Sequence, residues 1–436
     1  MSGAEPDAAQ VLAWDSAHVW HPYCAHDHVP PPEFVRCASG AYLELDDGRR
    51  IIDGNGSWWV SVLGHNHPSV VDAMRRQLDD MAHVSLAGLT HEPAARLAHR
   101  LVQLAPPGLN RVFYSDNGST AVEFAIRAAF QFHQQNGAPE RRRFITFDGA
   151  YHGDTLGAVS VGGVDTFHER FGPLLFGAIR VASPSAPRWY EDSVARLEAT
   201  LNADGDTVAA VIVEPLIQGA AGMLMYPAGA LRTIADACAR HGVLLIADEV
   251  FVGFGRTGTM FACEQAGVTP DFLCLSKGLT GGAMPFAATL TTERLFDGFR
   301  GDRSRMLHYG HSYCGNPLGC AAAHGTLDAF ESEGVLAGIP VRAALMDDGL
   351  RQIGGSDFVR TVRRTGLVGA VQIGEGSDYD RPVGWQVYAE ALARGAYLRP
   401  LGNVVYFVPP LNVETSVLER LLGIADDAIR AVAARA

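Results

Sequence analysis

A single lysine with catalytic potential follows a short apolar run. Residues 272–275 are Phe-Leu-Cys-Leu, Lys277 comes after one serine, and residues 278–282 are Gly-Leu-Thr-Gly-Gly. Because taking an ammonium group out of water is costly, a lysine at the end of a buried strand is usually paired, or is held neutral as a nucleophile. The glycines remove bulk and allow a second group to come close. The alternative is an ordinary strand end whose lysine extends its amine into water.

An acidic residue precedes this lysine by about one strand–helix–strand unit. Asp248 and Lys277 on neighbouring strands could form a buried salt bridge. They could also bracket a ring, with the lysine forming an imine with an aldehyde and the acid pairing with a protonated pyridine nitrogen. Pyridoxal phosphate (PLP) needs this pair, an anion site and a flat stacking partner. Tyr151 could supply the stacking face, or could be an ordinary half-buried tyrosine at a strand end.

An anion site is indicated by the sequence Gly118-Ser119-Thr120. These residues precede a helical pattern with apolar residues at positions 122, 126, 129 and 130. Small residues and hydroxyls at a helix N-terminus leave N–H groups free for a phosphate. The alternative is a plain N-cap. The chain has no Walker loop, since the pattern GxxxxGK[ST] is absent.

Residues 253–258, Gly-Phe-Gly-Arg-Thr-Gly, match the GxGxxG pattern of dinucleotide-binding loops, and Asp271 follows. Such a loop must open a long helix, but residues 257–267 allow barely two turns before Pro270. The acidic residues Asp248 and Glu249 would also lie in the path of a pyrophosphate. A non-catalytic nucleotide-binding protein is therefore kept only as the alternative from another functional class.

The elements that must position these residues form an α/β pattern. Short apolar runs alternate with helical stretches, which predicts a mostly parallel sheet covered by helices on both faces, with strands at 111–115, 143–147, 208–213, 243–247 and 272–275. In open α/β sheets, ligands bind beyond the carboxyl ends of the strands. We therefore expect one site to collect the residues that follow these strands, namely 116–120, 151–154, Glu214, Asp248 and Lys277.

The elements after about residue 321 predict a second, smaller α+β unit, with helices followed by strands near 359–362, 367–373 and 404–408. We also expect a hairpin at 41–53 and helices at 68–81 and 92–104 before the large sheet. A helix at 228–240 should connect two strands of that sheet. We expect residues 1–65 to contribute to the small domain, residues 66–320 to form the large cofactor-binding domain, and residues 321–436 to form the C-terminal small domain.

Composition excludes several classes of protein. The net charge is −13 with no basic block, which argues against a nucleic-acid or anionic-membrane surface. We find no N-terminal signal-peptide pattern and no apolar run of roughly 20 residues. The seven cysteines are dispersed without a CxxC pair, which predicts reduced thiols in a cytoplasmic protein and neither a disulfide framework nor a metal site.

Longer motifs carry a resemblance to a known family. Residues 248–250 with 253–258, and residues 276–282, resemble the class III (subgroup II) aminotransferases of PLP fold type I, from Trp20 to about Pro410. Further motifs resemble the branch of that family that transfers an amino group from S-adenosylmethionine to 8-amino-7-oxononanoate in biotin synthesis. These motifs lie at 20–23, 57–59, 64–68, 89–93, 151–155, 214–219 and 398–400.

The resemblance implies a homodimeric PLP enzyme and assigns roles around the cofactor. Lys277 would form the Schiff base and carry the proton between the two half-reactions. Asp248 would hold the pyridinium. Gly118 and Ser119 would bind the phosphate, and Tyr151 would stack on the ring.

The resemblance also implies a substrate channel lined by Tyr23, Trp58 and Tyr151. Asp154 would support Tyr23 by hydrogen bonding, and Arg399 would clamp the distal carboxylate of the oxononanoate. An arginine fork can grip a carboxylate with two parallel hydrogen bonds, and an aromatic wall can attract the donor's sulfonium.

Gly310 and Ser312 would reach the phosphate or the substrate of the neighbouring subunit. Three departures from the family pattern, at His311, Phe251 and 86–88, concern the pocket more than the chemistry. They leave the amino donor open between adenosylmethionine, lysine and another amine. Another class III transaminase, acting on an ω-amino acid or a diamine, is therefore the first alternative.

Overall fold

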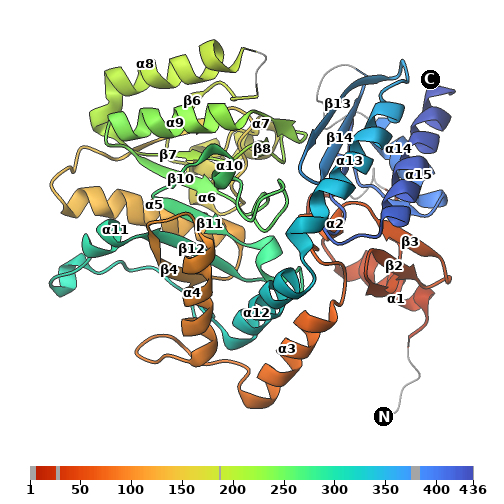
Figure 1. Ribbon diagram of the computed structural model, residues 1–436, viewed down its shortest axis with the longest axis horizontal. Helices are drawn as coiled ribbons and strands as arrows, with labels where there is room; N and C mark the ends of the chain where they lie inside the picture. The colour runs from red at the N-terminus through yellow and green to blue at the C-terminus, as the bar shows by residue number, and fades with distance from the viewer. Residues whose placement is uncertain (1–5, 26–29, 186–187, 375–382, 436) are drawn as a thin grey trace.

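The computed structural model describes residues 6–435 except 26–29, 186–187 and 375–382. Figure 1 shows a large sheet with its helices on one side of the molecule, and elements from both chain ends together on the other side. None of the helices in the described part is both long and apolar enough to cross a membrane.

The large sheet has seven strands in the order β4-β12-β11-β10-β7-β5-β6. Five of them, from β11 to β6, run parallel, while β12 pairs antiparallel with both β11 and β4. The prediction of a mostly parallel sheet is confirmed, and β12 is a strand that the sequence analysis missed. The bounds are β4 Leu109–Ser115, β5 Arg143–Phe147, β6 Ile179–Val181, β7 Val208–Val213, β10 Leu244–Asp248, β11 Phe272–Leu275 and β12 Ala287–Thr292.

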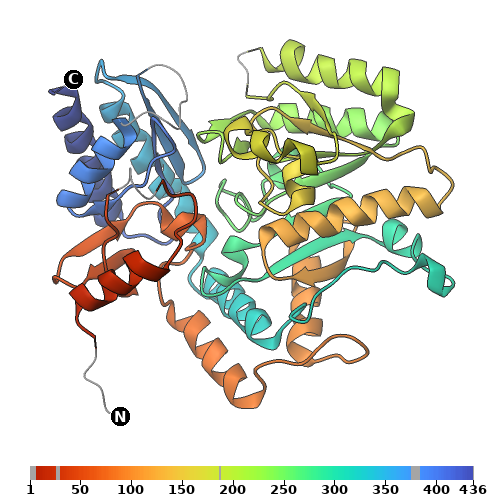
Figure 2. The ribbon, with the colours of Figure 1, turned by 180° about the vertical axis from the view of Figure 1, so that it is seen from behind.

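Both faces of the middle of this sheet are buried, which explains why β7, β10 and β11 are almost entirely apolar. Along β10, Leu244 and Ile246 pack in one core cluster, and Leu245 and Ala247 pack in the other. Successive side chains of a strand point to opposite faces, so a sheet covered on both sides needs apolar residues at every position. Figure 2 shows the long helix α5, Gly118–Gln135, lying against the sheet. Helices α8, Ala195–Asp204, and α9, Ala228–Arg240, pack against one another.

The two ends of the chain meet in a four-stranded sheet. Strands β1 (Val35–Ser39), β2 (Tyr42–Leu45) and β3 (Arg50–Asp53) are joined by β15 (Ala396–Tyr397), which runs parallel to β3. A second, antiparallel sheet contains β13 (Val359–Thr365), β14 (Val368–Ile373) and β16 (Val404–Phe407). This pairing agrees with a small unit built from both ends. The borders at 65/66 and 320/321 stay a prediction, and the second falls within helix α12, Pro317–Ser332.

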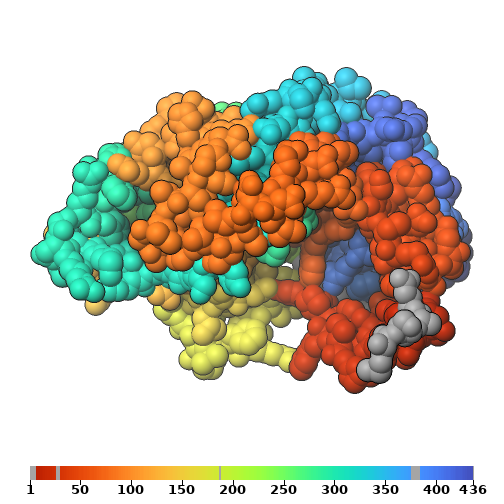
Figure 3. Space-filling model, turned by 90° about the horizontal axis from the view of Figure 1, so that it is seen from below, coloured from red at the N-terminus to blue at the C-terminus, as the bar shows by residue number. Residues whose placement is uncertain are grey.

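Several helices connect or cover these sheets. Helix α3 packs along α12, and Figure 3 shows α3 and α4, in orange, lying across the middle of one face. The helices expected near 68–81, 92–104 and 228–240 are all present. The remaining bounds are α1 Ala8–His18, α2 Gly56–Trp59, α3 Pro68–Asp80, α4 Glu92–Leu104, α6 Leu156–Ser160, α7 Asp165–His168, β8 Ile217–Gln218, β9 Leu224–Met225, α10 Cys263–Ala266, α11 Glu293–Asp297, α13 Val335–Ile353, α14 Val383–Ala393 and α15 Thr415–Ala433.

Candidate active site

The carboxyl ends of β4, β5, β7, β10 and β11 open onto one cavity of about 760 Å³. Its walls contain residues from all five predicted strand ends: Asp116 to Ser119, Tyr151 to Thr155, Glu214, Asp248, Ser276 and Lys277. The predicted convergence is therefore present in the folded chain. Glu249 points elsewhere, because its carboxylate accepts hydrogen bonds from the backbone N–H groups of Ala262 and Cys263.

Lys277 lies at this cavity in an unusual backbone conformation, with φ of 43°. Its Nζ atom lies 4.8 Å from the ring centroid of Trp59 and 5.9 Å from that of Phe251. Burial lowers the pKa of the Lys277 amine, and the negative charges of Asp248 and other nearby acids oppose this shift. An amine that loses its proton more readily is a better nucleophile and a better proton acceptor.

Asp248 is buried and is held by two donors. The Nδ1 atom of His152 lies 2.7 Å from Asp248 Oδ2, and the backbone N–H of Val250 donates to Oδ1 at 3.1 Å. The His152 side chain is fully buried, and its Nε2 atom has no hydrogen-bond partner in the described part of the chain. Sequence reasoning assigned no role to His152, although it follows Tyr151 directly. Its contact orients the carboxylate that faces the cavity.

The N-terminus of α5 forms one end of the cavity, where the sequence predicts an anion site. Asn117 caps the helix by accepting from the Thr120 N–H at 3.1 Å. A Cβ atom at Gly118 would lie 2.5 Å from Val250 Cγ1, so the backbone approaches this wall only because residue 118 is glycine. Ser119 Oγ lies 2.8 Å from Thr155 Oγ1, which fixes the hydroxyl at the same turn. The N-cap is therefore present in the structure, and the anion site at the same turn stays a prediction.

A second buried acid supports the wall that carries Tyr151. Glu214 accepts hydrogen bonds from the backbone N–H groups of Tyr151 and Gly219, each at 3.0 Å. Burial raises the pKa of Glu214 to about 7, and the nearby charge of Asp248 acts in the same direction. Because both carboxylate oxygens are used by backbone donors, Glu214 fixes the position of the Tyr151 backbone.

A second cavity of about 630 Å³ adjoins the first, and both share Trp59, Val60, Tyr151, Asp154 and Lys277 in their walls. It also contains Tyr23 and Trp58, which were predicted to line a substrate channel, and Arg399, which was predicted to clamp a carboxylate.

The two tyrosines of this channel meet at one carboxylate. Tyr23 OH donates to Asp154 Oδ1 at 2.5 Å, and Tyr151 OH donates to Oδ2 at 2.9 Å. Burial raises the pKa of both tyrosines, so their hydroxyls stay protonated near neutral pH. The expected support of Tyr23 by Asp154 is present.

Arg399 lies between two indole rings. Its guanidinium carbon is 5.1 Å from the ring centroid of Trp58 and 5.6 Å from that of Trp385, and Nη2 donates to the Tyr23 carbonyl at 2.9 Å. Such contacts stabilise a cation and restrict its rotamers. Trp385 was not predicted, because a lone tryptophan on a helix is typical of ordinary packing.

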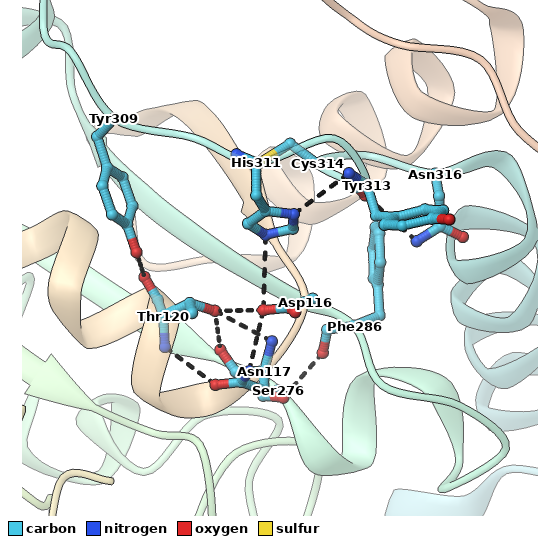
Figure 4. A network of polar contacts seen from close by, with 10 residues as sticks. All are labelled: Asp116, Asn117, Thr120, Ser276, Phe286, Tyr309, His311, Tyr313, Cys314 and Asn316. Atoms are coloured by element: carbon cyan, nitrogen blue, oxygen red, sulfur yellow. Dashed lines mark hydrogen bonds and ion pairs between the residues drawn. The ribbon is translucent and has the colours of Figure 1, made fainter. Parts of the chain in front are cut away.

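The segment that carries Gly310 and Ser312 lies over the β4–α5 turn (Figure 4). Tyr309 OH donates to the Thr120 carbonyl at 3.0 Å, and His311 Nε2 lies 3.5 Å from Asp116 Oδ1. Gly310 and Ser312 are not among the described residues that line either cavity. Their contribution to a neighbouring subunit stays a prediction.

The GxGxxG segment at 253–258 does not open a long helix, since the next helix, α10, has only four residues. Arg256 is fully buried and donates to the Pro409 carbonyl at 2.7 Å. A Cβ atom at Gly253 would lie 2.8 Å from the Glu249 carbonyl, so this glycine serves close packing of the chain. The geometry does not favour a dinucleotide loop.

Comparison with known proteins gives one consistent result. The family model for aminotransferase class-III matches residues 23–429. An adenosylmethionine-8-amino-7-oxononanoate aminotransferase of Geobacter sulfurreducens is 42% identical, with 98% of each chain covered. The enzyme of the same name from Nitratidesulfovibrio vulgaris is 45% identical over 97% of this chain and 82% of its own.

Solved structures agree with the sequence relatives. The crystal structure of the enzyme of that name from Methanocaldococcus jannaschii has a TM-score of 0.94 at 36% identity, covering 98% of this chain and 99% of its own. An (S)-enantioselective ω-transaminase from Thermomicrobium roseum has a TM-score of 0.93 at 30% identity, covering 98% and 100%. The family model matches most of the chain, and Lys277, Asp248 and the N-terminus of α5 line one cavity. The chain therefore belongs to the class III aminotransferases and is a PLP-dependent transaminase.

Proposed function

We propose that this transaminase moves an amino group from S-adenosylmethionine to 8-amino-7-oxononanoate, giving 7,8-diaminononanoate for biotin synthesis. The observation that carries the proposal is the position of Arg399. Lys277 lines both cavities, whereas Arg399 lines only the channel, where it lies between two tryptophans. An acceptor with a carbonyl at one end and a carboxylate at the other could place its carbonyl near Lys277 and its carboxylate at Arg399. The similarity to enzymes named for these two substrates supports the same assignment.

We propose that the first cavity holds PLP, because its residues fit each part of that molecule. Lys277 is placed to bind the aldehyde, Asp248 the ring nitrogen, and Gly118 and Ser119 the phosphate, with Tyr151 beside the ring. Three observations support the fit: the buried amine, the carboxylate fixed by His152, and the helix N-terminus that a Cβ at residue 118 would obstruct. Bound PLP supplies an electron sink that stabilises negative charge at the substrate carbon.

The chain's own residues perform the remaining tasks. The Lys277 amine, whose pKa burial lowers, would take the proton from the donor's carbon and pass it on within that half-reaction, and in the other half-reaction it would deliver a proton to the acceptor's carbonyl carbon. Asp248 keeps the proton on the ring nitrogen, and its contact with His152 prevents the carboxylate from rotating away. Trp59 and Phe251 exclude water around the amine.

The channel must accept two unlike substrates in turn. For the acceptor, the Arg399 fork binds the distal carboxylate, and aromatic side chains line the path of the methylene chain. For the donor, the faces of Tyr23 and Trp58 attract the sulfonium. Asp154 holds the Tyr23 and Tyr151 hydroxyls at the junction of the two cavities.

The proposal is tested with the two half-reactions measured separately. The PLP-loaded enzyme is mixed with adenosylmethionine or with lysine, and the visible absorbance of the cofactor is followed. We expect adenosylmethionine to bleach it and 8-amino-7-oxononanoate to restore it. If lysine alone bleaches the cofactor, the donor assignment is wrong. If 8-amino-7-oxononanoate does not restore it, the acceptor assignment fails.

Another class III transaminase is the second candidate, because the chain is 30% identical to an ω-transaminase with the same fold. A screen of acceptors separates the two. An enzyme of the proposed kind prefers a carbonyl compound with a remote carboxylate, whereas an ω-amino acid or diamine transaminase turns over short aldehydes and ketones equally well.

We also propose a homodimer in the cytoplasm. An apolar groove of about 820 Å³, which includes Phe296, Phe299, Met306 and Leu307, lies next to the segment that carries Gly310 and Ser312. A second copy of the chain would bury this groove. In such a dimer, Gly310 and Ser312 of each subunit would reach the cofactor cavity of the other subunit. All seven cysteines are free thiols, which suits a reducing compartment. Sedimentation at several protein concentrations tests the dimer.

A further inference from the structure

The turn that presents Trp58 to the channel has a left-handed backbone. Gly56, Ser57, Trp58 and Trp59 have φ values of 55°, 43°, 65° and 78°. Residues other than glycine visit this region singly, and rarely in a row. A run of three such residues, including two tryptophans, persists only when the surrounding structure holds it in place.

Part of that hold comes from the buried carboxylate of Asp53, which is 1% exposed. Asp53 Oδ2 accepts from Ser57 Oγ at 2.8 Å and lies 2.9 Å from His65 Nε2. Its Oδ1 atom accepts from the Asn55 N–H at 3.3 Å. The Asp53 carboxylate therefore connects Asn55 before the turn, Ser57 within it and His65 after it.

The second part comes from Asn55, which is also 1% exposed. Its Oδ1 atom accepts from the backbone N–H of Arg399 at 2.5 Å, and its Nδ2 atom donates to the Tyr406 carbonyl at 2.9 Å. The Asn55 carbonyl accepts from the Trp59 N–H at 2.9 Å. Asn55 is thus bonded to the Trp58 turn through its backbone and to the Arg399 segment through its side chain.

We propose that Asn55, held by Asp53, is a positioning residue that sets the distance between Trp58 and Arg399, and with it the length of acceptor that the channel takes. The inference rests on the proposed function, because it assumes that Arg399 receives the acceptor's carboxylate. Asn55 touches neither cavity: it is absent from the described lining residues of both. Its effect must therefore pass through the residues it holds.

The chemistry of the amide makes this connection specific. Asn55 uses an acceptor toward residue 399 and a donor toward residue 406, so neither Asp nor Leu can replace it. Aspartate keeps the shape but places an oxygen against the Tyr406 carbonyl. Alanine removes both of these bonds to buried backbone groups. Either change frees the Arg399 segment to move relative to Trp58, 5.1 Å away.

The test compares Asn55→Asp and Asn55→Ala with Asn66→Asp. Asn66 donates to the Ala38 carbonyl at 2.8 Å and lines neither channel nor cofactor cavity, so it matches the chemical change. Acceptors are 8-amino-7-oxononanoate and analogues with one or two fewer methylenes before the carboxylate. We expect the ratio of kcat/KM for the full-length acceptor to that for the shorter analogues to be about tenfold lower in the Asn55 variants than in wild type. The rate of the donor half-reaction should stay within about twofold of wild type. The Asn66 variant should keep the wild-type preference.

An unchanged length preference would overturn the proposal, as would equal losses in both half-reactions. Hydrogen exchange gives a second readout that needs no turnover. Asn55→Asp should accelerate exchange in 56–60 and 396–402 together while β10 stays protected. Acceleration across the whole chain, or in only one segment, contradicts the link. If wild type uses no carboxylate acceptor, the proposed function fails, and joint exchange of the two segments still decides whether Asn55 connects them.

Discussion

Replacing Arg399 with alanine removes the cation at the acceptor end of the channel. Among its described contacts with protein oxygens, the guanidinium donates only from Nη2, to the Tyr23 carbonyl. The remaining N–H groups of the fork are therefore available for a substrate carboxylate. We expect the change to weaken use of 8-amino-7-oxononanoate much more than use of the donor.

The size of the effect follows from the environment of the guanidinium. Truncating one partner of a buried, hydrogen-bonded charge pair costs about 2–5 kcal/mol. Arg399 is only partly buried, so solvent screens the pair, and about 2–4 kcal/mol is the appropriate range. At about 1.4 kcal/mol for each factor of ten, kcat/KM for the acceptor should fall roughly 30- to 700-fold.

The assay follows the visible absorbance of the cofactor in each half-reaction by stopped flow. Arg399→Ala is compared with Arg399→Lys, which keeps the charge but loses the planar fork and should show an intermediate loss. The methyl ester of the acceptor provides a further control. Wild type should discriminate strongly between acid and ester, and Arg399→Ala should discriminate little.

Three outcomes would refute the reasoning. Arg399→Ala could lower both half-reactions equally, which would indicate a general structural role through the contacts with Tyr23 and Trp58. It could keep the wild-type preference for acid over ester, which would place the carboxylate elsewhere. Arg399→Lys could also match wild type, in which case the paired hydrogen bonds of the fork would not matter.

Three other changes test two residues of the site and one buried acid outside it. Lys277→Ala should abolish turnover and leave the cofactor without a covalent bond to the chain, so borohydride reduction followed by mass spectrometry should find no adduct; normal activity would contradict its role. Gly118→Ala brings a Cβ within 2.5 Å of Val250 Cγ1 and should weaken PLP binding about tenfold in an absorbance titration, and wild-type affinity would show that this wall is not the phosphate site. Burial raises the pKa of Glu249 from about 4.5 to about 7, so the folded state holds this proton more tightly than the unfolded state. Stability should therefore fall as pH rises from about 4.5 to about 7, by about 3 kcal/mol for this group, and thermal unfolding of Glu249→Gln between pH 5 and 8 should show a weaker dependence; an unchanged slope would count against this assignment.

Five strands of the large sheet, and the residues that gather at its edge, could be predicted from the sequence. Continuous apolar runs such as 208–213 and 272–275 are typical of strands buried on both faces, and the boundaries agree with the structure within two residues. Because parallel strands end at the same edge, the positions of Asp248 and Lys277 after neighbouring strands were enough to bring them to one cavity. These features depend on local periodicity and on one general rule of topology.

The contacts that hold the channel residues in place could not be predicted from the sequence. The pairing of β3 with β15 brings residues 53–55 beside 397–399, more than 340 positions along the chain, and no local pattern indicates that contact. The left-handed turn at Trp58 opposes local preference by roughly 1–2 kcal/mol per residue, so the sequence around it predicts another conformation. His152 and Trp385 likewise acquire their roles from partners distant in sequence. Local propensity specifies elements, whereas hydrogen bonds between remote segments fix the distances between the residues of the channel.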